Sequence, residues 1–159
     1  MSQKAVDVYP DRCSGCRICE LICSFHHERE FNITYSRIRI LKNDRMGIDF
    51  PILCFQCEKA PCIDVCPVGA ISSDRETGAI SIDEDRCIVC RGCLIVCPYG
   101  ALSLHTKRRT MIACDLCGGE PLCVEWCPND ALKFVSKGKI DMLRRRMAME
   151  GMEKLRERV

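Results

Sequence analysis

The chain has 159 residues, a length that fits one domain or two very small ones. Sixteen residues are cysteine, and without them the hydrophobic fraction of 47% falls to roughly 37%, which is thin for a self-sufficient core. The near balance of 24 basic and 22 acidic residues excludes a disordered chain. No apolar run approaches the roughly 18 residues of a membrane-spanning helix.

The first ten residues lack the hydrophobic segment of a secretory signal peptide. We therefore expect a cytoplasmic protein, in which the reducing environment keeps thiols free and makes a disulfide framework improbable. Metal binding is then the expected role of the cysteines.

The chain begins with a predicted short strand before the first of four cysteine groups. Group one has the spacing C-x2-C-x2-C-x3-C and consists of Cys13, Cys16, Cys19 and Cys23. Ser14 and Gly15 in this group, like Gly92 later in the chain, are small residues expected to let the backbone approach bound sulfur closely. His26 and His27 follow, and we interpret them as surface or packing residues, with ligation or proton transfer as the alternative.

Residues 33–53 contain a partly alternating pattern around a polar turn and predict a β-hairpin. Group two follows with the spacing C-x2-C-x4-C-x3-C and consists of Cys54, Cys57, Cys62 and Cys66. A polar turn at 72–78 separates two short apolar stretches, which predicts a hairpin-like linker to the next group.

Group three repeats the spacing of group one and consists of Cys87, Cys90, Cys93 and Cys97. Group four has the spacing C-x2-C-x5-C-x3-C and consists of Cys114, Cys117, Cys123 and Cys127. Proline follows the last cysteine of groups two, three and four, and it predicts a helical turn that opens there. Ser24 replaces this proline in group one, a difference expected to affect only the start of its helix.

The run C-x2-C-x2-C-x3-C-P is the bacterial ferredoxin pattern for [4Fe-4S] clusters, whose fourth cysteine ligates the neighbouring cluster. Structural zinc sites use CxxC pairs separated by a longer stretch, or cysteine with histidine, and neither fits four consecutive groups of four. The motifs for a radical S-adenosylmethionine site and for a c-type haem are absent from the sequence. We therefore expect four [4Fe-4S] clusters.

The short linker between groups two and three predicts that these two groups form one module, which leaves groups one and four to pair around it. Exchange of the fourth cysteine within each pair then predicts four ligand sets. These are Cys13, Cys16, Cys19 and Cys127; Cys114, Cys117, Cys123 and Cys23; Cys54, Cys57, Cys62 and Cys97; and Cys87, Cys90, Cys93 and Cys66.

The four groups in this order, the stretches 56–62 (QCEKAPC) and 65–71 (VCPVGAI), and the stretch 114–117 (CDLC) carry a family resemblance. Over residues 3–136 the sequence resembles the four-cluster iron–sulfur subunits of molybdenum and tungsten oxidoreductases, such as those of dimethyl sulfoxide reductase and formate dehydrogenase. Its shortness is similar to the small polyferredoxin subunits found with tungsten aldehyde oxidoreductases.

The resemblance implies an α+β fold of two fused bacterial-type two-cluster ferredoxin modules, related by pseudo-twofold symmetry. An outer module would comprise residues 1–31 and 106–137, and an inner module residues 54–105. The hairpin at 32–53 would be an insertion, and residues 138–159 would form a C-terminal amphipathic helix.

The implied function is one-electron transfer in anaerobic metabolism, without catalysis by this chain alone. The clusters would form a wire from a catalytic Mo or W subunit to a second redox partner, such as a flavoprotein subunit or a soluble ferredoxin. The alternative is a free polyferredoxin that shuttles between separate enzymes.

Two basic runs, at 107–109 and 144–146, could suggest nucleic acid binding. Four all-cysteine clusters would shift the formal charge from +2 to about −6, so we interpret these runs as compensation or docking faces. The apolar stripe with methionines in 138–159 predicts docking on another subunit or self-association, the alternative being packing on its own module.

Overall fold

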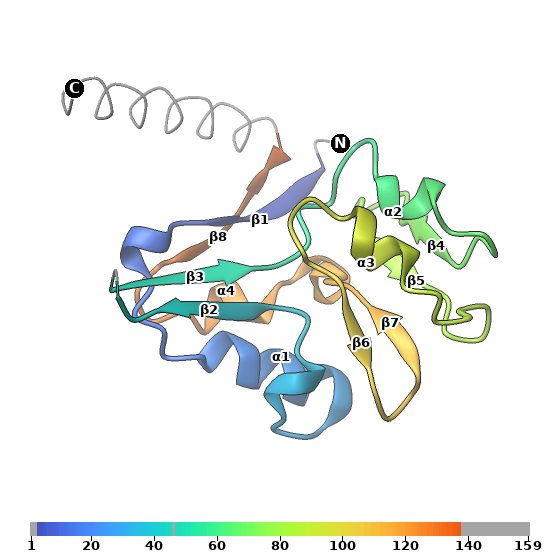
Figure 1. The fold of residues 1–159 in the computed structure, drawn as a ribbon. Helices are drawn as coiled ribbons and strands as arrows, with labels where there is room; N and C mark the ends of the chain where they lie inside the picture. The colour runs from blue at the N-terminus through green and yellow to red at the C-terminus, as the bar shows by residue number, and fades with distance from the viewer. Residues whose placement is uncertain (1–2, 46, 138–159) are drawn as a thin grey trace, which may run out of the picture.

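The computed structural model describes residues 3–45 and 47–137, so the predicted helix over 138–159 lies outside the described residues. In the described part, short helices and four two-stranded antiparallel sheets form an α+β fold (Figure 1). The helices are too short, and too poor in apolar residues, for any of them in this part of the chain to cross a membrane.

The two ends of the described chain pair with each other. Strand β1 (Lys4–Val8) lies antiparallel to β8 (Leu132–Ser136), with Val8 opposite Leu132. Helix α1 (Ile18–Glu28) packs beside α4 (Leu122–Glu125). Cysteine groups one and four therefore occupy one region of the molecule, as Figure 1 shows.

The middle of the chain forms a second region from consecutive elements. Helix α2 (Pro61–Asp64) packs beside α3 (Gly92–Val96). Between them, β4 (Ile71–Ser73) and β5 (Ile80–Ile82) form the hairpin expected from the polar turn. Strands β6 (Ser103–His105) and β7 (Thr110–Ile112) form another hairpin, which leads from group three to group four.

Strands β2 (Arg39–Asn43) and β3 (Ile48–Ile52) form an antiparallel hairpin inside the stretch 33–53. The carboxylate of Glu20 accepts the backbone N–H of Ile40 at 2.9 Å, which ties this hairpin to α1. Three 3-10 segments, η1 (Pro10–Arg12), η2 (Ile33–Tyr35) and η3 (Leu116–Gly119), complete the described elements.

The helical turns do not open at the fourth cysteine of each group, as the prolines had led us to expect. In groups two to four the helix contains the third cysteine and ends before the fourth. Proline after the fourth cysteine disfavours helical backbone at the residue before it, so the helix ends there. A short non-helical turn follows, in which the N–H of Gly69 donates to the carbonyl of Cys66 at 3.2 Å in group two. With Ser24 in this position, α1 continues through Cys23 to Glu28.

One buried cluster of side chains forms the core, and cysteines are part of it. Apolar residues such as Val6, Ile38 and Leu53 are almost completely buried there. Cysteines from all four groups belong to the same cluster: Cys19, Cys23, Cys54, Cys62, Cys93, Cys114 and Cys123. The thin apolar composition is thus supplemented by sulfur in the interior.

Gln56 links three parts of this core through its buried side chain. Its amide nitrogen donates to the carbonyl of Cys114 at 2.6 Å, and its amide oxygen accepts the backbone N–H of Ile80 at 2.7 Å. The side chain therefore satisfies backbone groups from group four and from β5 at the same time.

We predict that Gln56→Ala destabilises the protein, because it leaves a carbonyl and an N–H buried without partners. Each orphaned group costs about 1–3 kcal/mol. Thermal unfolding of the anaerobically purified holoprotein measures the effect. Gln3→Ala, which removes an exposed amide that accepts from Lys137 at 2.8 Å, is the control and should unfold close to the parent. Equal melting temperatures for the two variants would contradict the prediction.

Candidate metal centres

The first cavity beside the cysteines lies between α1 and the loop after α4. It has a volume of about 330 Å³ and an almost entirely apolar lining. Its sulfur atoms come from group one and from the last cysteine of group four. We call this set site I: Cys13, Cys16, Cys19 and Cys127.

A second cavity, of about 320 Å³, has the corresponding composition in the other region. Its sulfur atoms come from group three and from the last cysteine of group two. Ile71, Ile82 and Met111 provide apolar walls. We call this set site IV: Cys66, Cys87, Cys90 and Cys93.

The remaining eight thiols approach one another in two further sets. The thiol of Cys54 interacts electrostatically with Cys57, Cys62 and Cys97, and we call these four residues site III. The thiols of Cys114, Cys117 and Cys123 all interact with Cys23. These four form site II: Cys23, Cys114, Cys117 and Cys123.

Burial sets the protonation of many of these thiols. It raises the pKa of Cys54 to about 12, with neighbouring thiols adding to the effect. Burial likewise raises the pKa of Cys93 and of Cys117, each to about 11. Such thiols lose their protons only to a strong positive charge, and iron provides it because metal coordination deprotonates a thiol outright. The donor set therefore fits iron–sulfur clusters.

Backbone N–H groups aimed at sulfur support the same fit. Ala70 donates to Cys66 Sγ at 3.2 Å, and Ala131 donates to Cys127 Sγ at 3.3 Å. Both alanines stand four residues after the last cysteine of their group, which gives a physical role to the repeated alanine in the flanks. Such hydrogen bonds stabilise thiolate and influence cluster potentials.

The cluster loops of groups one and three share an unusual backbone. Gly15 and Arg17 have φ of 62° and 62°, and the equivalent residues Val89 and Arg91 have φ of 57° and 61°. A β-branched valine rarely adopts this left-handed region. Gly15 also faces the carboxylate of Asp49, which would clash with a Cβ at that position.

At Gly92, by contrast, the neighbouring cysteine thiol leaves room for a side chain. A Cβ at this position would meet Cys90 Sγ at 3.8 Å, an ordinary contact distance.

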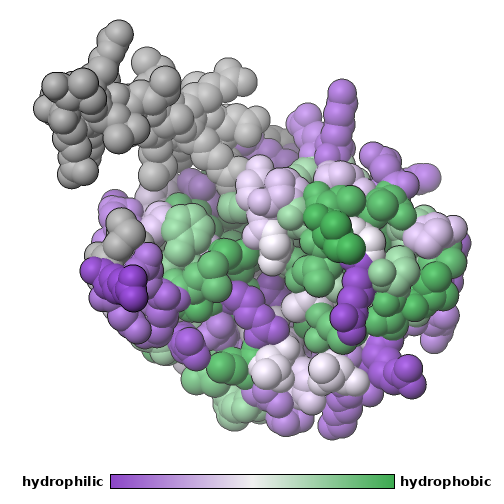
Figure 2. All heavy atoms as spheres, in the orientation of Figure 1, coloured by the Kyte–Doolittle hydropathy of each residue, from purple (hydrophilic) through white to green (hydrophobic). Residues whose placement is uncertain are grey.

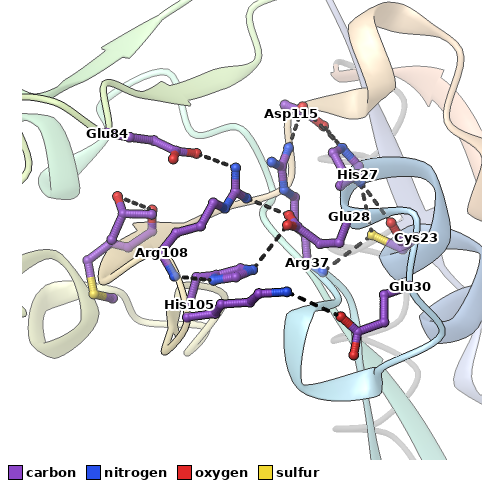
Figure 3. A network of polar contacts seen from close by, with 12 residues as sticks. Cys23, His27, Glu28, Glu30, Arg37, Glu84, His105, Arg108 and Asp115 are labelled. Carbon is purple, nitrogen blue, oxygen red and sulfur yellow. Dashed lines mark hydrogen bonds and ion pairs between the residues drawn. The ribbon is translucent and has the colours of Figure 1, made fainter.

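His27 is a site residue that the sequence analysis assigned to surface or packing. Its ring Nδ1 lies 2.8 Å from the carbonyl oxygen of Cys23 and 3.8 Å from Cys23 Sγ. Its Nε2 lies 3.1 Å from the carboxylate of Asp115 in group four (Figure 3). Nothing in the sequence around His27 indicates Asp115, which lies 88 residues further along the chain.

Electrostatics at site II reflects these contacts. Burial alone would lower the pKa of His27, but hydrogen bonds to Asp115 and Cys23 outweigh burial and raise this pKa to about 9. Burial alone would raise the pKa of Cys23, but the hydrogen bonds from His27 and the Arg37 N–H lower it from its ordinary value. These hydrogen bonds thus favour negative charge on the sulfur of Cys23, whereas burial raises the pKa of the three other thiols of site II.

At site I, carboxylates add to the effect of burial on the thiols. Burial raises the pKa of Cys19 to about 12, and the carboxylate of Glu20 adds to this. The Glu20 side chain is 4% exposed, and Arg17 lies 3.6 Å from it. Asp49 similarly raises the pKa of Cys13, after burial as the main cause.

The basic run at 107–109 supplies internal ion pairs. Arg108 contacts Glu28 at the end of α1 and Glu84 after β5 (Figure 3). Lys107 lies 3.9 Å from Glu30. The buried ring of His105 stacks on Tyr35, accepts the backbone N–H of Arg108 and lies 3.2 Å from Glu28. Two cations of this run are therefore paired with carboxylates of the same chain.

Comparison with known proteins places this arrangement in a family. Residues 46–137 match the model of the 4Fe-4S dicluster domain. The polyferredoxin-like subunit of an aliphatic sulfonate oxidoreductase from Pyrococcus furiosus is 41% identical over 150 residues, which cover 92% of this chain and 86% of the relative. A subunit of the anaerobic dimethyl sulfoxide reductase of Escherichia coli is 36% identical over 153 residues, covering 85% of this chain and 73% of the relative.

A solved structure has a related fold. The active site complex BamBC of benzoyl coenzyme A reductase contains a polypeptide that superposes with a TM-score of 0.52 at 30% identity. The superposition covers 85% of this chain and 79% of the other.

The cysteines complete the assignment. Their number, sixteen, equals the number of thiolate ligands that four [4Fe-4S] clusters require. The chain belongs to the 4Fe-4S dicluster domain family, and its cofactors are four [4Fe-4S] clusters.

Proposed function

We propose that this chain is the electron-transfer subunit of an oxidoreductase complex and relays single electrons between a catalytic subunit and a second redox partner. The observation that carries the proposal is the gathering of the cysteines into sites I to IV. When bound, the clusters supply reversible one-electron redox chemistry. All-cysteine ligation occupies the coordination positions that a substrate would need, so the protein residues hold and tune the clusters and do not catalyse a reaction.

The ligand sets proposed for the clusters are the four sites themselves. In each site, three cysteines come from one group and the fourth from its paired group. The cavity linings at sites I and IV and the electrostatic contacts at sites II and III support this exchange.

We also propose that the fold comprises two fused ferredoxin modules, an outer one of residues 1–31 and 106–137 and an inner one of residues 54–105. The packing of α1 beside α4 corresponds to that of α2 beside α3, which supports pseudo-twofold symmetry between them. On this proposal the segment 32–53, with its hairpin of β2 and β3, is an insertion.

The order of the relay is proposed from electrostatic interactions between thiols of different sites. Cys123 of site II interacts with Cys19 of site I, and Cys114 of site II interacts with Cys54 of site III. Cys93 of site IV interacts with Cys62 of site III. These contacts support a linear order from site I through II and III to IV.

The exposed thiols stand at the two ends of this order. Cys16 of site I and Cys90 of site IV are exposed, and they occupy equivalent positions in groups one and three. Ile88, which is 61% exposed, lines site IV beside Cys90, and Ile95 on α3 is 82% exposed. Figure 2 shows hydrophobic residues gathered on the face over α2 and α3. We propose that electron partners approach at these two ends.

The partners are proposed from the relatives. The names of two of them, subunits of a dimethyl sulfoxide reductase and of an aliphatic sulfonate oxidoreductase, support an oxidoreductase complex. A cytoplasmic location is part of the proposal and rests on the sequence alone. A Mo or W catalytic subunit and a flavoprotein or ferredoxin acceptor are the specific partners proposed. Segment 138–159 is proposed as a helix for docking or self-association. The alternative of a free carrier has support from relatives named only electron transport proteins.

The exchange of fourth cysteines predicts a pattern of cluster loss. In a redox titration, each cluster gives one reduction step, which we call its wave. Cys127→Ala and Cys16→Ala should alter the same wave, because both residues belong to site I. Cys123→Ala should alter a different wave, although Cys123 lies only four positions from Cys127. Redox titration of each purified variant, monitored by electron paramagnetic resonance, checks this. An identical altered wave for Cys123→Ala and Cys127→Ala would rule out the exchange.

The linear order predicts that loss of the cluster at either end, site I or site IV, stops electron transfer through the chain. In the native complex, Cys90→Ala should abolish most of the electron flow from the catalytic subunit to its acceptor. A small dye that accepts electrons directly from the catalytic subunit should remain active with this variant. Trp126→Phe, a change at an exposed non-ligand, is the control. Full electron flow through the Cys90→Ala complex would refute the relay.

Co-purification separates the subunit from the free carrier. An affinity-tagged chain, isolated anaerobically from its native host, should bring down a catalytic subunit at fixed stoichiometry, with Mo or W detected by metal analysis. Isolation of the tagged chain alone, fully loaded with iron, would favour the free carrier.

A further inference from the structure

Site II differs from the other sites by the imidazoles that gather around it. His27 contacts Cys23 through both the carbonyl oxygen and the sulfur, at 2.8 and 3.8 Å from Nδ1. Ring nitrogens of His26 and His27 lie within 4.8 Å of Cys117 Sγ. The remaining histidine of the chain, His105, instead contacts Glu28 and Arg108. Both histidines of α1 are thus placed at one cluster site.

The bonding of His27 determines its charge. Nδ1 faces a carbonyl oxygen, and Nε2 faces both carboxylate oxygens of Asp115 at 3.1 and 3.2 Å. Both partners only accept hydrogen bonds, so each ring nitrogen carries a proton and the ring is an imidazolium. Its side chain is 8% exposed, which limits screening by water.

Arg37 adds a second cation and a direct hydrogen bond. Its backbone N–H donates to Cys23 Sγ at 3.3 Å, and its guanidinium pairs with Asp115 (Figure 3). The carboxylate of Asp115 neutralises one of the two cations, so this trio carries one net positive charge. The Asp115 carboxylate also accepts the backbone N–H of Cys117 at 3.0 Å, which holds these three side chains next to the cysteines of site II.

We propose that His27, held by Asp115 and Arg37, raises the reduction potential of the cluster at site II above that of the cluster at site I. This inference rests on the proposed relay function. A cluster becomes more negative by one charge when it accepts an electron, so nearby positive charge and N–H donors favour its reduced form. His27 is therefore a positioning residue, and through it the cluster at site II is reduced in preference to the cluster at site I in the outer module.

Site I lacks this arrangement and has a buried carboxylate instead. Glu20 is next to Cys19 in sequence, and its side chain is 4% exposed, whereas its partner Arg17 is 40% exposed. Asp49 on β3 faces Gly15 of the cluster loop and lies 3.9 Å from Lys42, whose side chain is more exposed (41%) than that of Asp49 (21%). These carboxylates disfavour added negative charge at site I, which widens the expected difference between the two sites.

His27→Gln tests the proposal, because it removes the imidazolium and retains a side chain that can donate a hydrogen bond. In a redox titration of the four-cluster holoprotein, the wave altered by Cys117→Ala marks site II and the wave altered by Cys16→Ala marks site I. We expect His27→Gln to move the site II wave to more negative potential and leave the site I wave in place. Unmoved waves in a fully loaded His27→Gln protein would overturn the proposal.

Lys107→Gln is the matched control, since it also removes one positive charge. Lys107 is 73% exposed and pairs with Glu30 at 3.9 Å. Its replacement should leave the site II wave unchanged. A shift as large as that of His27→Gln would show a general effect of net charge and would also overturn the proposal.

A second pair of variants keeps the test decisive if His27→Gln loses iron. Arg37→Gln keeps the backbone N–H to Cys23 and should move the site II wave to more negative potential, whereas Glu20→Gln should move the site I wave to more positive potential. Absence of both shifts would refute the inference. The proposed function fails separately, if the parent protein binds fewer than four clusters.

Discussion

The fold depends on holding sixteen thiols in groups of four inside a small chain. Burial keeps thiols such as Cys54 and Cys93 protonated to high pH, so these positions have little reason to converge without iron. On the proposed ligand sets, each cluster cross-links two segments of the chain once iron replaces the protons, and at sites I and IV it fills a cavity between them. The thin apolar composition and the high cysteine content are thus two aspects of one constraint.

Convergence of distant segments requires support from ordinary interactions. Cys127 can reach Cys13 only because β1 pairs with β8 and α1 packs beside α4. Polar contacts complete the closure, with Gln56 joining group two to group four and Arg108 joining the end of α1 to Glu84. Four clusters also bring the formal charge from +2 to about −6, and the largely buried guanidinium of Arg37 offsets part of it beside site II.

The cysteine groups and their flanking motifs predicted the family and the cofactor type, because metal ligation restricts local sequence strongly. The polar turn at 72–78 predicted the hairpin of β4 and β5. The prolines after the cysteine groups were a poor guide to helix ends. Helix α2, for example, ends before Cys66, where we expected a helical turn to begin. His27 could not be assigned from sequence, because its role depends on Asp115 arriving from group four. Val89 likewise shows a left-handed backbone where sequence alone favours glycine, as found at Gly15.

Exposure and charge are distributed differently along the four sites, and this division suits a relay. The thiols open to solvent, Cys16 and Cys90, belong to sites I and IV, where a partner must come close for electrons to pass. Cys114 of site II and Cys54 of site III are buried. A charge acts more strongly in such an interior than at the surface, because less water screens it. The imidazolium of His27 therefore stands where one charge has the greatest influence on a potential, and the end sites stay free for exchange with partners.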